Sequence, residues 1–131
     1  MKTPKQSGFT VVELIVVILT ILLSAWLFTT QKLQFEAASR DRERKIAINA
    51  MYYSLEEVYF RANKSYPVSI GPNNLKSVDP SLFKDPNGVE VGKQSSDYFY
   101  TPINCDGNLC KSFVLRAKLE QEAEYKRNSV N

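Results

Sequence analysis

The stretch Gly-Phe-Thr-Val-Val-Glu-Leu at residues 8–14 begins an apolar run that continues to Thr29 and contains one charged side chain, Glu13. The run is about 21 residues long, and a helix of that length rises about 30 Å, the hydrocarbon thickness of a bilayer. Residues 9–30 are therefore predicted to form a membrane-spanning helix. A carboxylate inside such a helix is costly, although less so near one end, and is by default a functional residue with a partner.

The flanks of the apolar run predict its orientation. Lys2 and Lys5 precede the run, and no acidic residue lies within residues 1–8. The positive-inside rule then places the N-terminus in the cytoplasm and everything after about residue 30 outside. An ordinary secretory signal has an apolar core of about 7 to 15 residues with a small-residue cleavage site after it. Here the core is longer, and the small residue Gly8 stands before it.

The start of the chain resembles the precursors of type IV pilins and type II secretion pseudopilins. Residues 1–8 read Met-Lys-Thr-Pro-Lys-Gln-Ser-Gly, and residues 8–15 read Gly-Phe-Thr-Val-Val-Glu-Leu-Ile. Precursors in this family carry a short basic leader, then Gly, Phe, Thr, two apolar residues, Glu and a long apolar helix. The resemblance implies that a prepilin peptidase removes the leader after Gly8, that the new terminus at Phe9 is N-methylated, and that Glu13 acts in assembly.

Charge supplies a physical reason for this arrangement. Cleavage after Gly8 creates an amine on Phe9, whose pKa is ordinarily about 8, at the end of an apolar helix without another cation. In a bundle of identical staggered helices, the amine of one copy can meet Glu13 of its neighbour. Such a pair neutralises two charges that are costly to bury apart. The alternative is that Glu13 merely reaches the membrane interface.

The helix is predicted to continue outward, so that it covers about residues 9–63. No Pro or Gly occurs from Leu33 to about Asn63, and good helix formers dominate. The second half, residues 31–63, is amphipathic and carries an apolar stripe at spacings of three and four that fits against a sheet. The stripe consists of Ala47, Ile48, Met51, Leu55, Val58, Tyr59 and Ala62.

A charged run, Arg-Asp-Arg-Glu-Arg-Lys at residues 40–45, separates the two apolar sections of this helix. One interpretation is a solvated or headgroup-level collar, and the other is a set of salt bridges between subunits of a filament. Many type IV pilins carry a Pro in the mature helix, whereas this chain has none between Pro4 and Pro67. Pseudopilins and some pilins also lack it, so the subtype stays open.

Residues 64–131 are predicted to form one small head, which makes the chain an α+β protein with the fold expected of a pilin. Residues 64–96 are rich in Pro and Gly and are interpreted as a long loop over the helix. A β-hairpin is expected at about 97–119, with a short third strand near 89–93 and a polar tail at 120–131 that frays or lies on the surface. The apolar face of the hairpin, which would pack on the helix stripe, consists of Phe113, Leu115, Ala117 and Leu119.

Cys105 and Cys110 are the only cysteines of the chain and flank the expected hairpin turn. A location outside the cytoplasm favours their oxidation to a disulfide. A metal site would need more ligands than two thiols, and the chain has no His to supply them. Asp106 and Asn108 could join a calcium site of the kind some pseudopilins have, but turn chemistry explains both residues without an ion.

Composition limits the remaining classes of function. The 131 residues carry a net charge of +3, and basic and acidic residues are interspersed, which argues against a nucleic-acid-binding surface. The absence of His removes the commonest general base and the commonest metal ligand. We therefore expect neither an enzyme nor a cofactor.

The function expected from the resemblance is that of a structural subunit of a type IV pilus or pilus-like filament. Its partners would be other copies of itself, minor pilins, the prepilin peptidase, an inner-membrane assembly platform and, before assembly, membrane lipid. It would reside in the cytoplasmic membrane and then in a cell-surface or periplasmic filament. The alternatives are a type II secretion pseudopilin, a competence pilin that contacts DNA, and, more remotely, a monomeric single-pass anchor presenting a binding domain.

Overall fold

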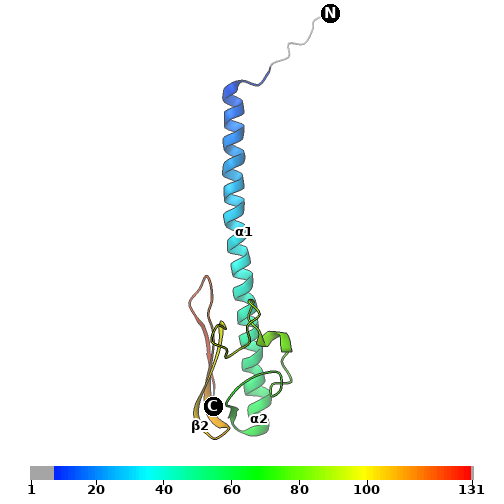
Figure 1. Ribbon diagram of the computed structural model, residues 1–131, viewed down its shortest axis with the longest axis vertical. Coiled ribbons are helices and arrows are strands. Elements are labelled where there is room, and N and C mark those ends of the chain that lie inside the picture. Colours follow the sequence, from blue (N-terminus) through cyan, green and yellow to red (C-terminus); the bar gives the residue numbers. More distant parts are fainter. Residues whose placement is uncertain (1–7, 131) are drawn as a thin grey trace, which may run out of the picture. The chain divides into compact units, whose positions relative to one another are not determined.

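The computed structural model describes residues 8–130 and divides into two compact units, Met1–Glu36 and Ala37–Asn131. We call these the N-terminal unit and the C-terminal unit. Helix α1, Val11–Tyr53, contributes to both and passes into a π-helical turn, Ser54–Tyr59, and the short helix α2, Phe60–Asn63 (Figure 1). The long helix expected at about 9–63 is thereby confirmed, and with the antiparallel sheet described below it makes the fold α+β.

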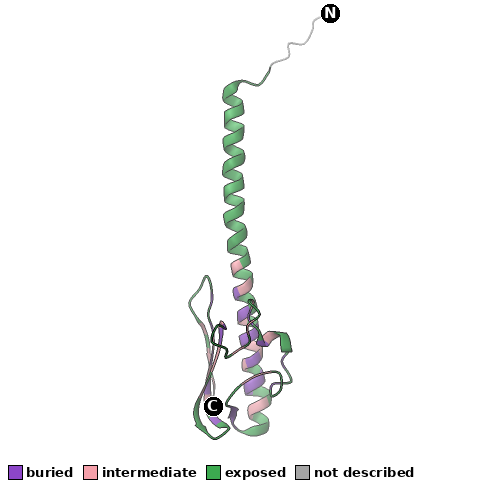
Figure 2. Ribbon diagram, in the orientation of Figure 1, coloured by how far each residue is buried: buried purple, intermediate pink, exposed green. Residues whose placement is uncertain are grey.

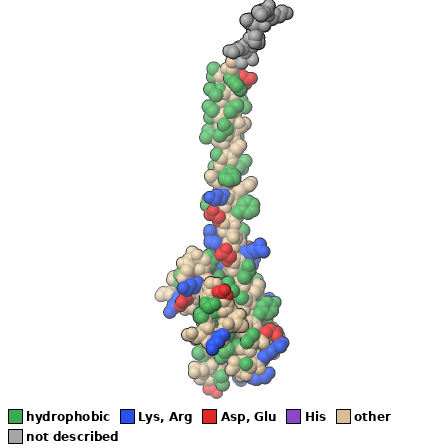
Figure 3. Space-filling view, turned by 90° about the vertical axis from the view of Figure 1, so that its right-hand side faces the viewer, with side chains coloured by type: hydrophobic (Ala, Val, Ile, Leu, Met, Phe, Trp, Pro, Cys, Tyr) green, Lys and Arg blue, Asp and Glu red, His purple; other side chains and the backbone are tan. Residues whose placement is uncertain are grey.

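The N-terminal unit has no core of its own among its described residues. Every residue from Gly8 to Glu36 is exposed, and Figure 2 shows this stretch of helix without a buried position. Its side chains are nevertheless apolar, and α1 is long and apolar enough to cross a membrane. The face of the molecule drawn in Figure 3 accordingly shows hydrophobic side chains along this part of the helix. So much exposed apolar surface is unfavourable in water and is typical of a segment that contacts a membrane or another protein.

The C-terminal unit contains a four-stranded antiparallel sheet with β3, Leu109–Ala117, at its centre. Strand β2, Tyr98–Asp106, pairs with β3 along its length to form the predicted hairpin. On the other side of β3 lie β1, Tyr66–Pro67, and β4, Tyr125–Asn128, which pair with opposite ends of the strand.

One expectation about the sheet is wrong, and another holds in part. Residues 89–93 form no strand, because their backbone makes only the isolated bridge between Lys84 and Glu90 and single hydrogen bonds such as that from the Val91 N–H to the Phe83 carbonyl. The tail at 120–131 lies on the surface, as one of the two alternatives had it, but it is not frayed, because it contains β4 and completes the sheet beside β3. Its short alternation, with half-buried Tyr125 and Arg127 between exposed neighbours, is too brief to stand out in the sequence.

The core lies between the sheet and the helix. Alternate residues of β3 face inward as predicted, since Phe113, Leu115 and Ala117 are each at most 1% exposed. They pack in one cluster with residues of the helix and with four residues of the 64–96 segment. The helix contributes Ala47, Ile48, Met51 and Leu55, and the segment contributes Tyr66, Leu75, Val78 and Phe83. Residues 64–96 therefore do lie over the helix, held by these anchors and by a 3₁₀ turn at Pro80–Phe83.

The predicted apolar stripe is confirmed as far as Leu55 and at Tyr59, which is half-buried against the core, but not at the other two positions. Val58 is 53% exposed and Ala62 is exposed as well. The cause is the π-helical turn at Ser54–Tyr59, because its wider i to i+5 hydrogen bonding rotates later residues out of the phase that an α-helix would give them. The helix then ends at Lys64, which adopts the left-handed conformation with φ 56°.

Candidate functional site

The candidate assembly site is the first turn of α1, where Thr10 and Glu13 cap the helix. The backbone N–H of Thr10 donates to Oε2 of Glu13 at 2.8 Å, and the Thr10 hydroxyl donates to the same oxygen at 2.9 Å. In return, the backbone N–H of Glu13 donates to the Thr10 hydroxyl at 3.3 Å. This reciprocal pattern is a capping box, which satisfies backbone N–H groups that the helix itself leaves open.

The sequence-based interpretation missed the capping role of Glu13. The signal was present, because Thr-Val-Val-Glu at residues 10–13 fits the pattern Ser/Thr-x-x-Glu/Gln that precedes an apolar helix. The capping box accounts for the position of the carboxylate but does not neutralise its charge. No cation among residues 8–130 forms a salt bridge with Glu13, and the two leader lysines lie outside the described residues.

The remaining polar side chains in the apolar part of the helix bond to their own backbone. The hydroxyls of Thr20, Ser24, Thr29 and Thr30 each donate to a carbonyl oxygen three or four residues earlier, at 2.7 to 2.9 Å. Such bonds allow hydroxyl residues to enter an apolar environment without an unsatisfied donor. Within residues 9–30, Glu13 is the one charged side chain, and it forms no salt bridge with another described residue.

The proposed cleavage position lies just before this cap. Gly8 and Phe9 precede the first residue of α1, and both are exposed, with Phe9 at 83%. The remainder of the predicted leader, residues 1–7, lies outside the described residues. The described part of the junction is therefore non-helical and accessible, as a peptidase substrate must be.

A second cluster of charges surrounds Arg44 in the C-terminal unit. The Arg44 guanidinium donates to Asp41 at 2.9 Å, to Glu120 at 2.8 Å and to Asp97 at 3.0 Å. Arg40 adds two further hydrogen bonds to the Glu120 carboxylate, at 2.8 and 2.6 Å. The cluster joins helix α1 to the start of β2 and to the segment after β3.

This cluster corrects the interpretation of residues 40–45 as a solvated collar. Asp41 and Arg44 are only 3% and 2% exposed, so half of the central charges of the run are internal. Their partners are carboxylates and backbone groups of the same chain rather than of another subunit. The sequence concealed this because those partners, Asp97 and Glu120, are far away along the chain.

The electrostatics of the cluster follow from its hydrogen bonds. Burial alone would raise the pKa of Asp41, but the backbone N–H groups of Glu120 and Gln121 and the Arg44 guanidinium outweigh burial and lower it. Hydrogen bonds from Arg40 and then Arg44 lower the pKa of Glu120 to about 2. Both carboxylates are therefore ionised at neutral pH, and the cluster fixes the segment after β3 to the helix.

The disulfide predicted between Cys105 and Cys110 is present. The two residues are directly opposite each other in the β2–β3 register, with Cα atoms 3.9 Å apart. Asp106 and Leu109 form the next pair, so Gly107 and Asn108 make the turn. For the alternative of a calcium ion near Asp106, residues 8–130 offer no group of three or more His, Cys, Asp or Glu side chains that could hold a metal ion.

Comparison of the chain with protein-family models, with curated protein sequences and with solved structures returned no match.

Proposed function

We propose that the chain is a structural subunit of a type IV pilus or pilus-like filament, which polymerises through its N-terminal helix after cleavage between Gly8 and Phe9. One observation carries the proposal. The apolar part of α1 is exposed over its whole described length and holds a single carboxylate, Glu13, without a cationic partner among residues 8–130. A surface of this kind must be covered, and the uncompensated charge specifies what covers it.

The partner that fits best is the N-terminus of another copy. Cleavage places a new amine at Phe9, and a neighbour shifted along the helix axis can bring that amine to the Glu13 carboxylate. Attraction between the two groups depends on the register of the helices, so it selects one stagger over others. In the membrane the apolar surface of α1 contacts lipid, and in the filament it contacts the same surface of neighbouring subunits.

The capping box favours a second function, that of a monomeric single-pass anchor. If Glu13 serves only to begin the helix, Thr10 satisfies it and no second copy is needed. The C-terminal unit would then act as a binding domain held at the membrane. The two functions differ in the state of the N-terminus, because an anchor has no need of a free amine at Phe9.

Intact mass measurement and N-terminal sequencing of the protein from membranes test the proposal. We expect a chain that begins at Phe9 and carries an added methyl group. A chain that still begins at Met1, or that begins after residue 20, would contradict the proposal. A Gly8→Ala variant probes the peptidase site. The matched control is Gly71→Ala, because Gly71 is a half-buried glycine with open space around it.

Within the filament proposal, a pseudopilus of a secretion system and a competence pilus remain the alternatives to a surface pilus. The helix lacks a Pro in its apolar part, and the hairpin disulfide encloses a short loop. Imaging of cells for surface fibres separates them, since a pseudopilus remains in the periplasm. Binding of DNA by assembled fibres would identify the competence type.

A further inference from the structure

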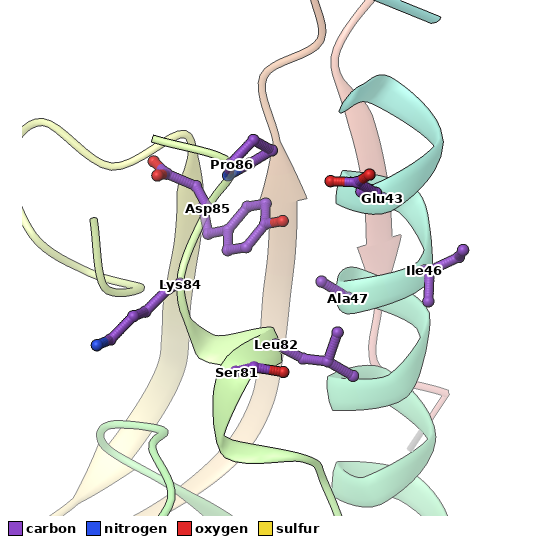
Figure 4. A pocket seen from close by; sticks show the side chains of 9 residues that line it. Glu43, Ile46, Ala47, Ser81, Leu82, Lys84, Asp85 and Pro86 are labelled. Carbon is purple, nitrogen blue, oxygen red and sulfur yellow. The ribbon is translucent and has the colours of Figure 1, made fainter. Parts of the chain in front are cut away.

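A hollow of about 340 Å³ opens between helix α1 and the 80–86 segment of the C-terminal unit (Figure 4). Its wall is largely apolar, formed by Ile46, Ala47, Leu82 and Pro86. The lining also includes five polar side chains, none of which has a role in the assembly site described above: Glu43, Ser81, Lys84, Asp85 and Tyr98. This combination suits a side chain with an apolar stem and a polar end.

The Tyr98 hydroxyl is an unpartnered polar group in this wall. Tyr98 lines the hollow and is 1% exposed, and its hydroxyl makes no hydrogen bond within residues 8–130. Burial raises the pKa of Tyr98 to about 12, so the group is neutral at physiological pH and its oxygen can accept a hydrogen bond.

Glu43 supplies the charge at the mouth. Figure 4 shows its carboxylate pointing from α1 across the hollow toward Pro86, whereas the Lys84 side chain points away. Glu43 has no salt bridge or hydrogen bond to its carboxylate among the described residues. The other acid in the wall, Asp85, is committed to the backbone N–H groups of Asn87, Val89 and Asp97. Of the two acids that line the hollow, Glu43 is thus the one available to a cation.

Lys126 is a cation of this chain that lacks a counter-ion. It lies on β4 directly opposite Arg116 of β3, on the sheet face that points away from buried Leu115 and Ala117. Like charges directly opposite each other are unfavourable. Arg116 forms a salt bridge with Glu124 at 3.4 Å, whereas Lys126 forms no ion pair within residues 8–130. An external carboxylate would relieve the repulsion.

We propose that this hollow binds the Lys126 side chain of a second copy, with the lysine stem against the apolar wall and the ammonium between the Glu43 carboxylate and the Tyr98 hydroxyl. The inference deepens the proposed filament function and rests on it. The hollow is on the helix side of the sheet and Lys126 is on the other, so the contact uses two different surfaces. When the rotation between successive copies does not close a ring, a contact between two different surfaces repeats and builds an open filament.

Carbodiimide cross-linking of full-chain assemblies tests the contact. Assemblies are formed from a mixture of unlabelled and ¹⁵N-labelled subunits, and the reagent joins a carboxylate to an amine without a spacer. We expect a peptide that joins Glu43 to Lys126 with mixed isotope composition, which proves that the two residues belong to different copies. Lys126→Arg should abolish this product while assembly persists, because the charge is kept and the reactive amine is lost.

Charge exchange supplies an independent readout. Glu43→Lys and Lys126→Glu should each weaken assembly about threefold to tenfold, the range for loss of one partly exposed ion pair, and the double variant should recover it. Tyr98→Phe should lower the yield of the cross-link by a similar factor. Glu90→Gln, at an exposed acid without an ion pair among the described residues, is the matched control and should change nothing.

The outcomes separate this inference from the proposed function. Fibres with a processed N-terminus but no Glu43–Lys126 product, or a Glu43 product with a different lysine, overturn the contact and leave the filament function standing. The same holds if the double charge exchange assembles no better than the single variants. A wild-type chain that begins at Met1 and forms no multimer overturns both.

Discussion

The N-terminal and C-terminal units each place a charged side chain in apolar surroundings, and they compensate it differently. In the C-terminal unit, Arg44 is buried and forms salt bridges with three carboxylates of its own chain. In the N-terminal unit, the carboxylate of Glu13 is positioned by Thr10, but no cation of the described chain neutralises it. The difference indicates that the buried charge of Arg44 is compensated within one copy, whereas the charge of Glu13 is not compensated among the described residues.

The two units also differ in how their apolar surface is satisfied. Leu55 and Leu115 are fully buried within the C-terminal unit, whereas Leu23 of the N-terminal unit is 60% exposed. Burial of a leucine contributes roughly 1.5 to 3 kcal/mol wherever it occurs. In the C-terminal unit folding supplies that contribution, and under the proposed function contact with lipid or with other subunits supplies it in the N-terminal unit.

The largest expected effect comes from breaking the compensated cluster. Arg44→Met keeps the apolar stem of the side chain but leaves Asp41 buried without its cation, so we expect the C-terminal unit to lose about 3 to 5 kcal/mol of unfolding free energy. Denaturant unfolding followed by circular dichroism measures it. The control is Arg42→Met in the same charged run, because Arg42 is exposed and should change stability by less than about 0.5 kcal/mol. Equal stability of the two variants would show that the cluster is not a structural lock.

Replacing one leucine by alanine in each unit tests the difference in burial between the two units. Leu55→Ala should destabilise the C-terminal unit by about 2 to 5 kcal/mol, because it opens a cavity in the core. Leu23→Ala should leave the thermal unfolding of that unit unchanged and instead weaken membrane retention or assembly. A shift of the unfolding transition by Leu23→Ala would contradict the independence of the two units.

Removal of the disulfide should cause a smaller loss of unfolding free energy, confined to the C-terminal unit. The bridge closes a short loop, so replacing both Cys105 and Cys110 by Ser should cost about 2 kcal/mol on the chain-entropy estimate. The β2–β3 pairing on either side supports the same register, so the hairpin should survive. Denaturant unfolding gives the cost, and amide exchange across β3 checks the hairpin. Loss of protection throughout β3 would mean that the disulfide holds the sheet together.

The smallest expected effect is the response of the cluster to acid. The folded-state pKa of Glu120 is about 2, below its ordinary value of 4.5, because Arg40 and Arg44 donate hydrogen bonds to its ionised form. Its stabilising contribution is therefore complete above about pH 4.5 and is lost as the pH falls toward 2. The lowered pKa of Asp41 acts in the same direction. Glu120→Gln should flatten the pH dependence of the unfolding temperature below pH 4.5, and an unchanged slope would contradict this assignment.

Much of the architecture could be predicted because it depends on local pattern. The uninterrupted run of helix formers, the alternation of Phe113, Leu115 and Ala117, and the cysteines flanking Asp106-Gly107-Asn108-Leu109 each specify an element from neighbouring residues. The elements that escaped prediction depend on pairing across the chain. Strand β1 has two residues and β4 has four, so neither shows a periodicity until β3 is beside it.

The charge sites were predictable to different degrees for the same reason. Glu13 stands out because its neighbours along the chain are apolar, and even its capping partner Thr10 is three residues away. Arg44 lies in a run of charges that reads as solvent-exposed, and its partners Asp97 and Glu120 are 53 and 76 residues away. The local pattern therefore identified Glu13, which lacks a counter-ion, but it did not reveal the buried site of Arg44, whose counter-ions are distant in sequence.

The central claim is that the uncompensated charge of Glu13 directs assembly, and Glu13→Gln tests it most directly. Glutamine can keep the hydrogen bonds of a capping box but carries no charge to neutralise an amine. The control, Thr10→Ala, removes the capping hydroxyl and keeps the carboxylate. The measurement is the fraction of processed subunits recovered in sedimented filaments. We predict that Glu13→Gln lowers this fraction at least about tenfold while Thr10→Ala assembles. Filaments from Glu13→Gln at the wild-type level would contradict the claim.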